Sequence, residues 1–217
     1  MKKYSKEVEE LFSYGQADLS SPWPNYVKEL HLKEENSEEL IDIINTSDLS
    51  RAVSGFTIKD FGARHAWRAI GQLKILNAVD SLLKALTNKK NIEAFEYQIE
   101  LPKVLSLIGD DAIPKLISFL NDKNNDWNFK IIIFKALVNI AIQNPEHKDT
   151  VLAVFKDLSI DYEENYIFIS SLLNILFQIN PVDSEVVKEI IDKNKYDFGI
   201  IDEKAISKFI KDARMYE

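Results

Sequence analysis

The sequence contains no cysteine, and this absence removes several kinds of chemistry at once. Disulfide bonds, thiolate metal sites and cysteine nucleophiles are all excluded. Only 6 glycines and 6 prolines occur among 217 residues, so few positions interrupt regular backbone structure. Leucine, isoleucine, lysine and glutamate are abundant, and this composition favours long helices over sheets.

Long hydrophobic runs are missing as well. The most apolar stretch, residues 131–142, has 12 residues and includes Lys135 and Asn139. A membrane span needs about 20 predominantly apolar residues. The N-terminus carries charges where an export signal requires an apolar run. We therefore expect a soluble cytoplasmic protein with no membrane partner.

The charge of the chain is acidic but unevenly distributed. The formal net charge is −8, made up of −6 for residues 1–50, +6 for residues 51–90 and −8 for residues 91–217. An acidic protein is repelled by the phosphate backbone, so a nucleic-acid partner is not expected. The basic middle segment is either a local site for an anion or an acidic partner, or it is neutralised by acidic neighbours inside the protein. The second interpretation is the simpler one.

Helical periodicity begins near the N-terminus and continues to the end of the chain. Residues 5–14 and 37–44 each have an amphipathic pattern, and prolines interrupt the chain between Ser20 and Pro24. From residue 60 onwards, apolar segments of helical length alternate with short breaks. The helices predicted there are Phe61–Ile75, Ala78–Leu86, Phe95–Ile108, Ala112–Leu120, Asp126–Ile142, His147–Leu158, Tyr166–Ile179, Ser184–Ile191 and Asp202–Asp212.

Similar helix segments recur at a nearly constant spacing. The segment at Ile70 has a counterpart 34 residues later at Val104, another 32 residues later at Ala136, and a fourth 36 residues later at Leu172. Repeats of this length built from helix pairs are typical of an α-solenoid, because one pair cannot cover its own apolar face.

We therefore predict an all-α protein, an α-solenoid of about four HEAT-like helix pairs with helical N- and C-terminal caps. We expect one domain over residues 1–217. The N-terminal cap would span residues 1–58, the repeats residues 59–195 and the C-terminal cap residues 196–217.

Two segments resemble HEAT-like repeat proteins, a group that includes the phycobilin-lyase type, and within it a bacterial family of helix-pair proteins. They are Trp23-Pro24-Asn25-Tyr26 and His65-Ala66-Trp67-Arg68-Ala69-Ile70-Gly71-Gln72-Leu73. The resemblance covers roughly residues 22–205 and implies the solenoid fold. Some relatives end in a cysteine-rich SEC-C tail that binds zinc. This chain lacks cysteine, so neither the tail nor its metal is implied.

The helix that begins near residue 61 carries the strongest candidates for a binding site. His65 and Arg68 are three residues apart and share a helix face, and Arg64 precedes them. They could contact an anion or a carboxylate in a groove. Alternatively, His65 and Arg68 are partners of local acids such as Glu100, and Trp67 is a core anchor. We favour this structural interpretation and keep the binding site as a hypothesis.

The aromatic residues Trp23 and Tyr26 are the second set of candidates. They could bind a partner from the N-terminal loop, or they could close the open end of the first repeat. The second role is the expected one, since an apolar end of a solenoid must be covered.

No metal or cofactor is predicted. His31 and His147 have no obvious companions, and no His-Glu dipeptide of the kind used by di-iron HEAT-type hydroxylases occurs. The polar stretch 121–130 lacks the glycine and the glutamate of a calcium loop, so it is predicted to be an inter-helix turn with Asp126 as the N-cap of the next helix.

These observations favour a protein that is not an enzyme. The predicted function is a scaffold that presents a curved helical surface to a protein or peptide partner. The alternative is an enzyme of the solenoid lyase or DNA glycosylase type with a groove near residues 51–90. A glycosylase would need a basic groove with aromatic residues, and only this segment is basic.

Overall fold

The structure is a computed structural model, and it describes residues 4–46, 58–87, 95–181, 184–193, 195–197 and 199–213. All the regular elements in these ranges are helices, which confirms the predicted all-α class. The chain divides into two compact units, residues 1–115 and residues 116–217. The expected single domain therefore stays a prediction. Residues 51–57 and 88–90 of the basic segment lie outside the described residues.

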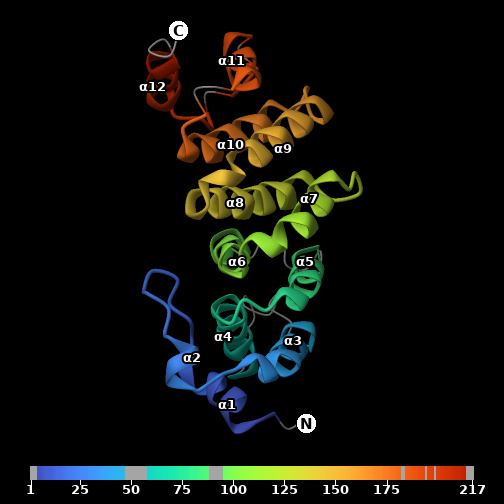
Figure 1. Ribbon diagram of the computed structural model, residues 1–217, viewed down its shortest axis with the longest axis vertical. Coiled ribbons are helices and arrows are strands. Elements are labelled where there is room, and N and C mark those ends of the chain that lie inside the picture. The colour runs from blue at the N-terminus through green and yellow to red at the C-terminus, as the bar shows by residue number, and fades with distance from the viewer. Residues whose placement is uncertain are drawn as a thin grey trace. The chain divides into compact units, whose positions relative to one another are not determined.

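Unit 1 contains short N-terminal helices followed by four longer helices in the part of the chain that the structure describes (Figure 1). Its elements, with 3₁₀-helices labelled η, are α1 Lys6–Glu9, η1 Glu10–Tyr14, α2 Tyr26–Glu29, η2 Glu34–Asn36, α3 Ser37–Thr46, α4 Ile58–Gln72, η4 Leu76–Ala78, α5 Val79–Thr87, α6 Phe95–Ile108 and η6 Asp110–Ala112. The boundary between the units falls within α7, Ile113–Asn121.

Unit 2 continues with helices of similar length. Its elements after α7 are α8 Trp127–Gln143, η7 Pro145–His147, α9 Lys148–Asp161, α10 Tyr166–Leu176, η8 Phe177–Ile179, α11 Glu185–Asp192 and α12 Glu203–Ala213. These positions agree closely with the helices predicted from periodicity.

Helix α4 is the centre of unit 1, because it contacts α3, η1 and α6 (Figure 1). Small residues allow the close contacts. A Cβ atom at Gly62 would lie 2.2 Å from the Phe12 ring, and one at Gly71 would lie 3.3 Å from the Val104 backbone. Gly71 therefore permits close packing of α4 against α6.

Helix α8 is the longest helix of unit 2, and it contacts both α9 and α10. Ile133, Phe134 and Leu137 are completely buried on it, as expected for a helix that neighbours cover on several sides. The Trp127 and Phe168 rings lie 6.1 Å apart between α8 and α10. The core of unit 2 thus lies between α8 and the two helices that follow it, α9 and α10.

Two predicted helices end earlier than periodicity indicated, and the backbone explains why. Helix α4 stops at Gln72 instead of Ile75, because Lys74 adopts a left-handed conformation with φ 55°. Similarly, α10 gives way to a 3₁₀ turn, and Asn180 with φ 48° terminates it. Ile75 and Ala78, which follow α4, are still buried, so the apolar pattern there continues beyond the helix itself.

Candidate functional site

The residues predicted as a binding site do come together, but most of them are buried in unit 1. Tyr26, Arg64, His65, Arg68 and Glu100 each have an exposed fraction of 4% or less. Only Trp23 is partly exposed. Nearly all of these side chains are therefore inaccessible to a partner.

Arg68 of α4 and Glu100 of α6 form a fully buried ion pair. The Arg68 Nε and Nη2 atoms each donate to a Glu100 carboxylate oxygen at 2.7 Å. Burial alone would lower the pKa of Arg68, but the hydrogen bonds and negative charge of Glu100 raise it above its ordinary value. This two-pronged geometry is the strong form of an arginine–carboxylate contact. The pairing of Arg68 with Glu100 follows the structural interpretation of the sequence.

Arg68 also holds the N-terminal segment. Its Nη2 atom donates to the Asp18 carbonyl oxygen at 2.8 Å, and the Trp23 ring lies over the guanidinium with 5.1 Å from Cζ to the ring centroid. A cation over an indole face is attracted by the ring quadrupole. Trp23 thus contacts the same cation that Glu100 neutralises, and covers it from the solvent side.

His65 uses both ring nitrogens within the protein. Its Nε2 atom lies 3.1 Å from the Gly15 carbonyl oxygen, and its Nδ1 atom lies 2.5 Å from the Tyr26 hydroxyl oxygen. Because a carbonyl only accepts, Nε2 carries the hydrogen and Nδ1 accepts from the tyrosine. Burial, with smaller contributions from Arg68 and Arg64, lowers the pKa of His65 below its usual range, so the ring is neutral at pH 7.

Gln72 completes the row of polar contacts and was not recognised from the sequence. Its Nε2 atom donates to the Pro24 carbonyl oxygen at 2.7 Å, and its Oε1 atom accepts from the Tyr26 backbone N–H at 2.9 Å. His65, Arg68 and Gln72 follow one another at intervals of three and four, so they share a face of α4. That spacing was a signal which could have identified Gln72.

Arg64 and Trp67 lie elsewhere on α4. Arg64 is buried, so it does not form an exposed basic patch with Arg68. Trp67 is 1% exposed, and its ring meets the Tyr97 ring edge-on at 4.7 Å. The interpretation of Trp67 as a core anchor is confirmed.

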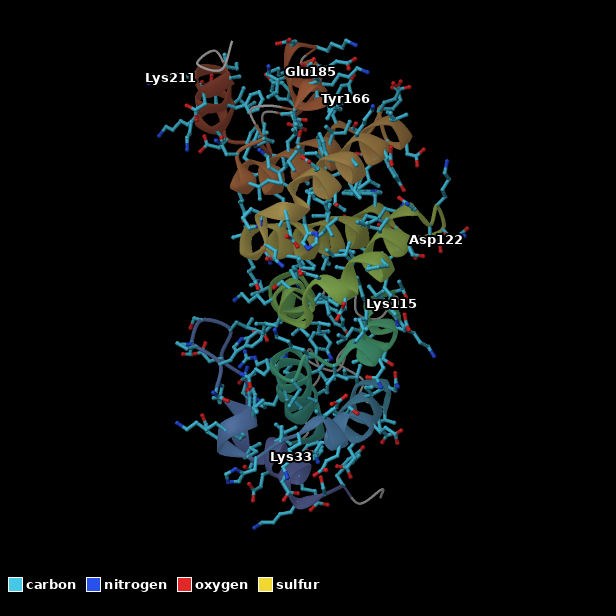
Figure 2. The ribbon with its side chains drawn as sticks, viewed as in Figure 1. Lys33, Lys115, Asp122, Tyr166, Glu185 and Lys211 are labelled. Atoms are coloured by element: carbon cyan, nitrogen blue, oxygen red, sulfur yellow. The ribbon has the colours of Figure 1, made fainter. Side chains whose placement is uncertain are left out.

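A different surface feature, which sequence reasoning missed, lies in unit 2. An open-sided groove of about 450 Å³ runs between α9 and α11 over the buried Ile169 of α10. Its apolar lining includes Leu152, Val186, Ile190 and Ile160. Ile160 is 62% exposed, a large unburied area for an isoleucine. Side chains around this groove, among them Glu185, are drawn in Figure 2.

Charged side chains of both signs line the groove in equal numbers, namely Lys156, Lys193 and Lys195 and Glu163, Glu185 and Glu189. Lys195 contacts Glu163 at 3.5 Å, which joins the ends of the α9 and α11 segments. Lys193 pairs with Glu189 on α11, and Lys156 adds a positive charge close enough to lower the pKa of Glu189 further. The groove therefore has an apolar lining with little net charge along its rim.

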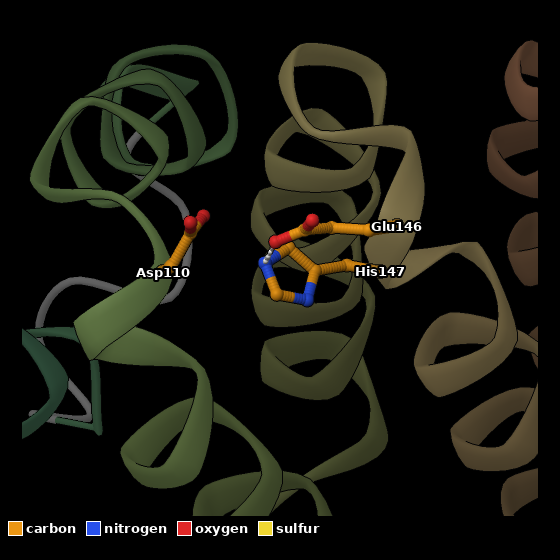
Figure 3. Close-up of side chains that lie close together, drawn as sticks. All are labelled: Asp110, Glu146 and His147. Atoms are coloured by element: carbon orange, nitrogen blue, oxygen red, sulfur yellow. Dashed lines mark ion pairs between the residues drawn. The ribbon is translucent and has the colours of Figure 1, made fainter.

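The remaining histidines lie apart from both regions. His31 is exposed and adopts φ 56°. His147 Nε2 lies 3.8 Å from a Glu146 carboxylate oxygen, and a dashed line in Figure 3 marks this contact. The contact is an ion pair when the ring is protonated. The prediction that the chain holds no metal or cofactor stays a prediction.

Comparison of the chain with protein-family models, curated proteins and solved structures found no match. The resemblance to HEAT-like repeat proteins thus rests on the quoted sequence segments. Of the helices that the structure describes, none has both the length and the apolar character of a membrane span.

Proposed function

We propose that this protein is a non-catalytic interaction scaffold, an α-solenoid of HEAT-like helix pairs, and that it binds a protein or peptide partner in the α9–α11 groove. The observation that carries the proposal is the exposed Ile160 side chain in an open-sided apolar groove. Apolar surface of this kind commonly marks a site where another molecule binds. The regular alternation of helices and short turns along the chain supports the solenoid arrangement.

The chemistry of the partner follows from the lining of the groove. Leu152, Ile160 and Val186 offer aliphatic contact, while the rim lysines are balanced by nearby glutamates. Phosphate groups would find few unpaired cations here. The occupant is therefore a peptide segment that inserts aliphatic or aromatic side chains, and its affinity depends on apolar burial more than on charge.

The hydrogen bonds of the predicted binding residues of unit 1 support a non-catalytic function. His65 donates to one protein group and accepts from another, and Arg68 is bonded to Glu100 and to Asp18. A general base or an anion-binding cation needs a free atom facing the substrate. These side chains instead use their polar atoms to hold the protein together, which weighs against the alternative of a lyase or glycosylase site in this part of α4.

Selection from a random peptide library displayed on phage tests the groove. We expect enrichment of peptides rich in aliphatic and aromatic residues, with affinities that change little between low and high salt. Ile160→Glu should weaken binding of an enriched peptide by about 10–100-fold, the affinity equivalent of one buried isoleucine side chain. Ile142→Glu is the matched control, since Ile142 is 48% exposed on α8 and does not line the groove.

Three results would contradict the proposal. One is the absence of any enriched peptide. Another is enrichment of acidic peptides whose binding disappears with salt, which would point to a basic surface. The last is equal loss of binding in the Ile160→Glu and Ile142→Glu variants, since a general effect on the fold would then explain both.

A further inference from the structure

The groove between α9 and α11 has a helix on each side, and this limits the backbone conformation of its occupant. Within a helix, main-chain N–H and C=O groups bond to one another. Along their length, α9 and α11 therefore lack the row of unpaired main-chain groups that a strand edge offers to an extended peptide. An extended occupant would bury its own main-chain groups against this surface without partners, which is costly.

The buried polar side chains of the lining do not replace such partners. They are the hydroxyl groups of Ser159 and Ser184, each 7% exposed. Ser159 Oγ donates to the Lys156 carbonyl oxygen at 2.8 Å, and Ser184 Oγ accepts from the Val187 backbone N–H at 3.5 Å. Both hydroxyls thus bond to their own helices. An occupant that forms its main-chain hydrogen bonds within itself avoids the cost, and for a single segment that conformation is the α-helix.

The lining residues follow helical spacing on both sides of the groove. On α9 and just beyond it they recur at intervals of three or four positions and include Leu152, Lys156, Ile160 and Glu163. On α11 and just beyond it they do the same and include Val186, Ile190 and Lys193. The α9 stripe extends over about 16 Å at a rise of about 1.5 Å per residue, which is the length of about three turns of a bound helix.

Two charges of the groove are available to a partner. Of the six charged residues that line it, four are paired with one another. The other two, Lys156 on α9 and Glu185 on α11, are exposed and form no ion pair in the part of the chain that the structure describes. Glu185 is labelled in Figure 2. An occupant with an acidic side chain beside Lys156 and a basic one beside Glu185 complements both.

We propose that the groove binds an amphipathic α-helix of a partner protein, which lies along α9 and α11 and packs an aliphatic stripe against Ile160. An acidic residue beside this stripe meets Lys156, and a basic residue meets Glu185. The inference rests on the proposed function, since it specifies the conformation of the peptide that the groove binds. Apolar burial supplies most of the affinity, while the two rim charges fix the position of the helix along the groove.

Proline substitution in the peptides enriched by the phage selection tests the helical conformation. Proline at a central position where the enriched sequences vary should weaken binding by about 100-fold, because it removes a helix hydrogen bond and clashes with the preceding turn. The same peptide with proline as its first residue is the matched control. It should bind within about 3-fold of the parent peptide, because the first turn of a helix has no such bond to lose. Isothermal titration calorimetry measures both affinities.

Charge reversal tests the position of the helix. Lys156→Glu should weaken binding of an enriched peptide with an acidic residue beside its apolar stripe by about 2–10-fold, and reversal of that peptide residue to lysine should restore the affinity. Lys208→Glu is the matched control, since Lys208 is exposed on α12 and does not line the groove. It should leave the affinity unchanged.

Four results would overturn this inference, and they point to different errors. Equal tolerance of central and first-position proline would show an extended occupant and leave the groove as a peptide site. Equal losses in Lys156→Glu and Lys208→Glu would remove the acidic contact. A dimer that Ile160→Glu converts to a monomer in gel filtration would show that a second copy of the chain fills the groove. Absence of any enriched peptide would overturn the proposed function together with this inference.

Discussion

At the residue scale, the polar side chains of α4 are notable because they make their hydrogen bonds inside unit 1. His65, Arg68 and Gln72 together bond to three carbonyl oxygens, one backbone N–H, a tyrosine hydroxyl and a carboxylate. Buried polar groups must find partners of this kind, because leaving one unpaired is more costly than the bond is favourable.

The Arg68–Glu100 ion pair gives a prediction at this scale. Glu100→Gln should lower the free energy of unfolding by about 3–5 kcal/mol, because it leaves the buried guanidinium without a counter-charge. Asp161→Asn is the matched control, since the Lys123–Asp161 pair is exposed and should contribute less than about 1 kcal/mol. Urea unfolding followed by circular dichroism measures both. Equal small losses would show that the Arg68 guanidinium is solvated, and would restore it as a candidate binding group.

At the element scale, helix ends and helix contacts are fixed by individual side chains. The predicted N-cap of α8 is present, because the Asp126 carboxylate accepts from the Asn128 backbone N–H at 2.8 Å. At the preceding turn, the buried Lys130 Nζ donates to the Leu120 carbonyl oxygen at 2.6 Å and lies 5.1 Å from the Tyr162 ring centroid. The turn between α7 and α8 is thus held by a cation that the sequence did not mark as buried.

The cap of α8 can be tested with two substitutions at one position. Asp126→Ala should lower the free energy of unfolding by about 1 kcal/mol, because the first turn of α8 loses an acceptor. Asp126→Asn keeps a side-chain oxygen and should change it by only a few tenths. Thermal unfolding monitored at the helical signal compares the two. Equal effects of alanine and asparagine would mean that the charge of Asp126 matters more than the cap.

The contact between α4 and α6 gives a second element-scale prediction. Gly71→Ala improves helix propensity by about 1 kcal/mol. It also places a methyl group 3.3 Å from both the Val104 Cα and its carbonyl oxygen, backbone atoms that cannot rotate away. Overpacking of this kind costs about 1–3 kcal/mol, so we expect a net loss of stability. A melting temperature above that of the wild type would show that α6 moves away easily.

At the scale of the whole molecule, the all-helical class follows from composition and periodicity, while the two compact units do not. The uneven charge of the sequence is also partly resolved in the structure. Arg68, a positive charge of the basic middle segment, is neutralised by an acid from the following segment. This agrees with the simpler interpretation of the charge pattern for this residue.

Metal content is a prediction about the whole molecule. The chain has no cysteine, and both nitrogens of His65 are bonded within the protein. Preparations made without added metal should therefore contain far less than one zinc or iron per chain by elemental analysis. About one tightly bound ion per chain would contradict this and would favour the enzymatic alternative.

The sequence by itself determined the helical class, most of the helix positions and the cap at Asp126. These features depend on local propensity and on the 3.6-residue periodicity of apolar side chains, and both are properties of neighbouring residues. It also indicated which residues would gather around α4, because the spacing of His65 and Arg68 is a local property too.

Only the tertiary structure decided what those residues do. Whether Arg68 faces solvent or Glu100 depends on the approach of α6, which lies 32 positions away in sequence. The role of Gln72 depends on where residues 24–26 cross α4. The groove that exposes Ile160 likewise exists because α9 and α11 line it on two sides, while the apolar pattern of α9 alone would be the same for a buried isoleucine. Contacts between distant segments are set by packing, which local sequence patterns do not encode.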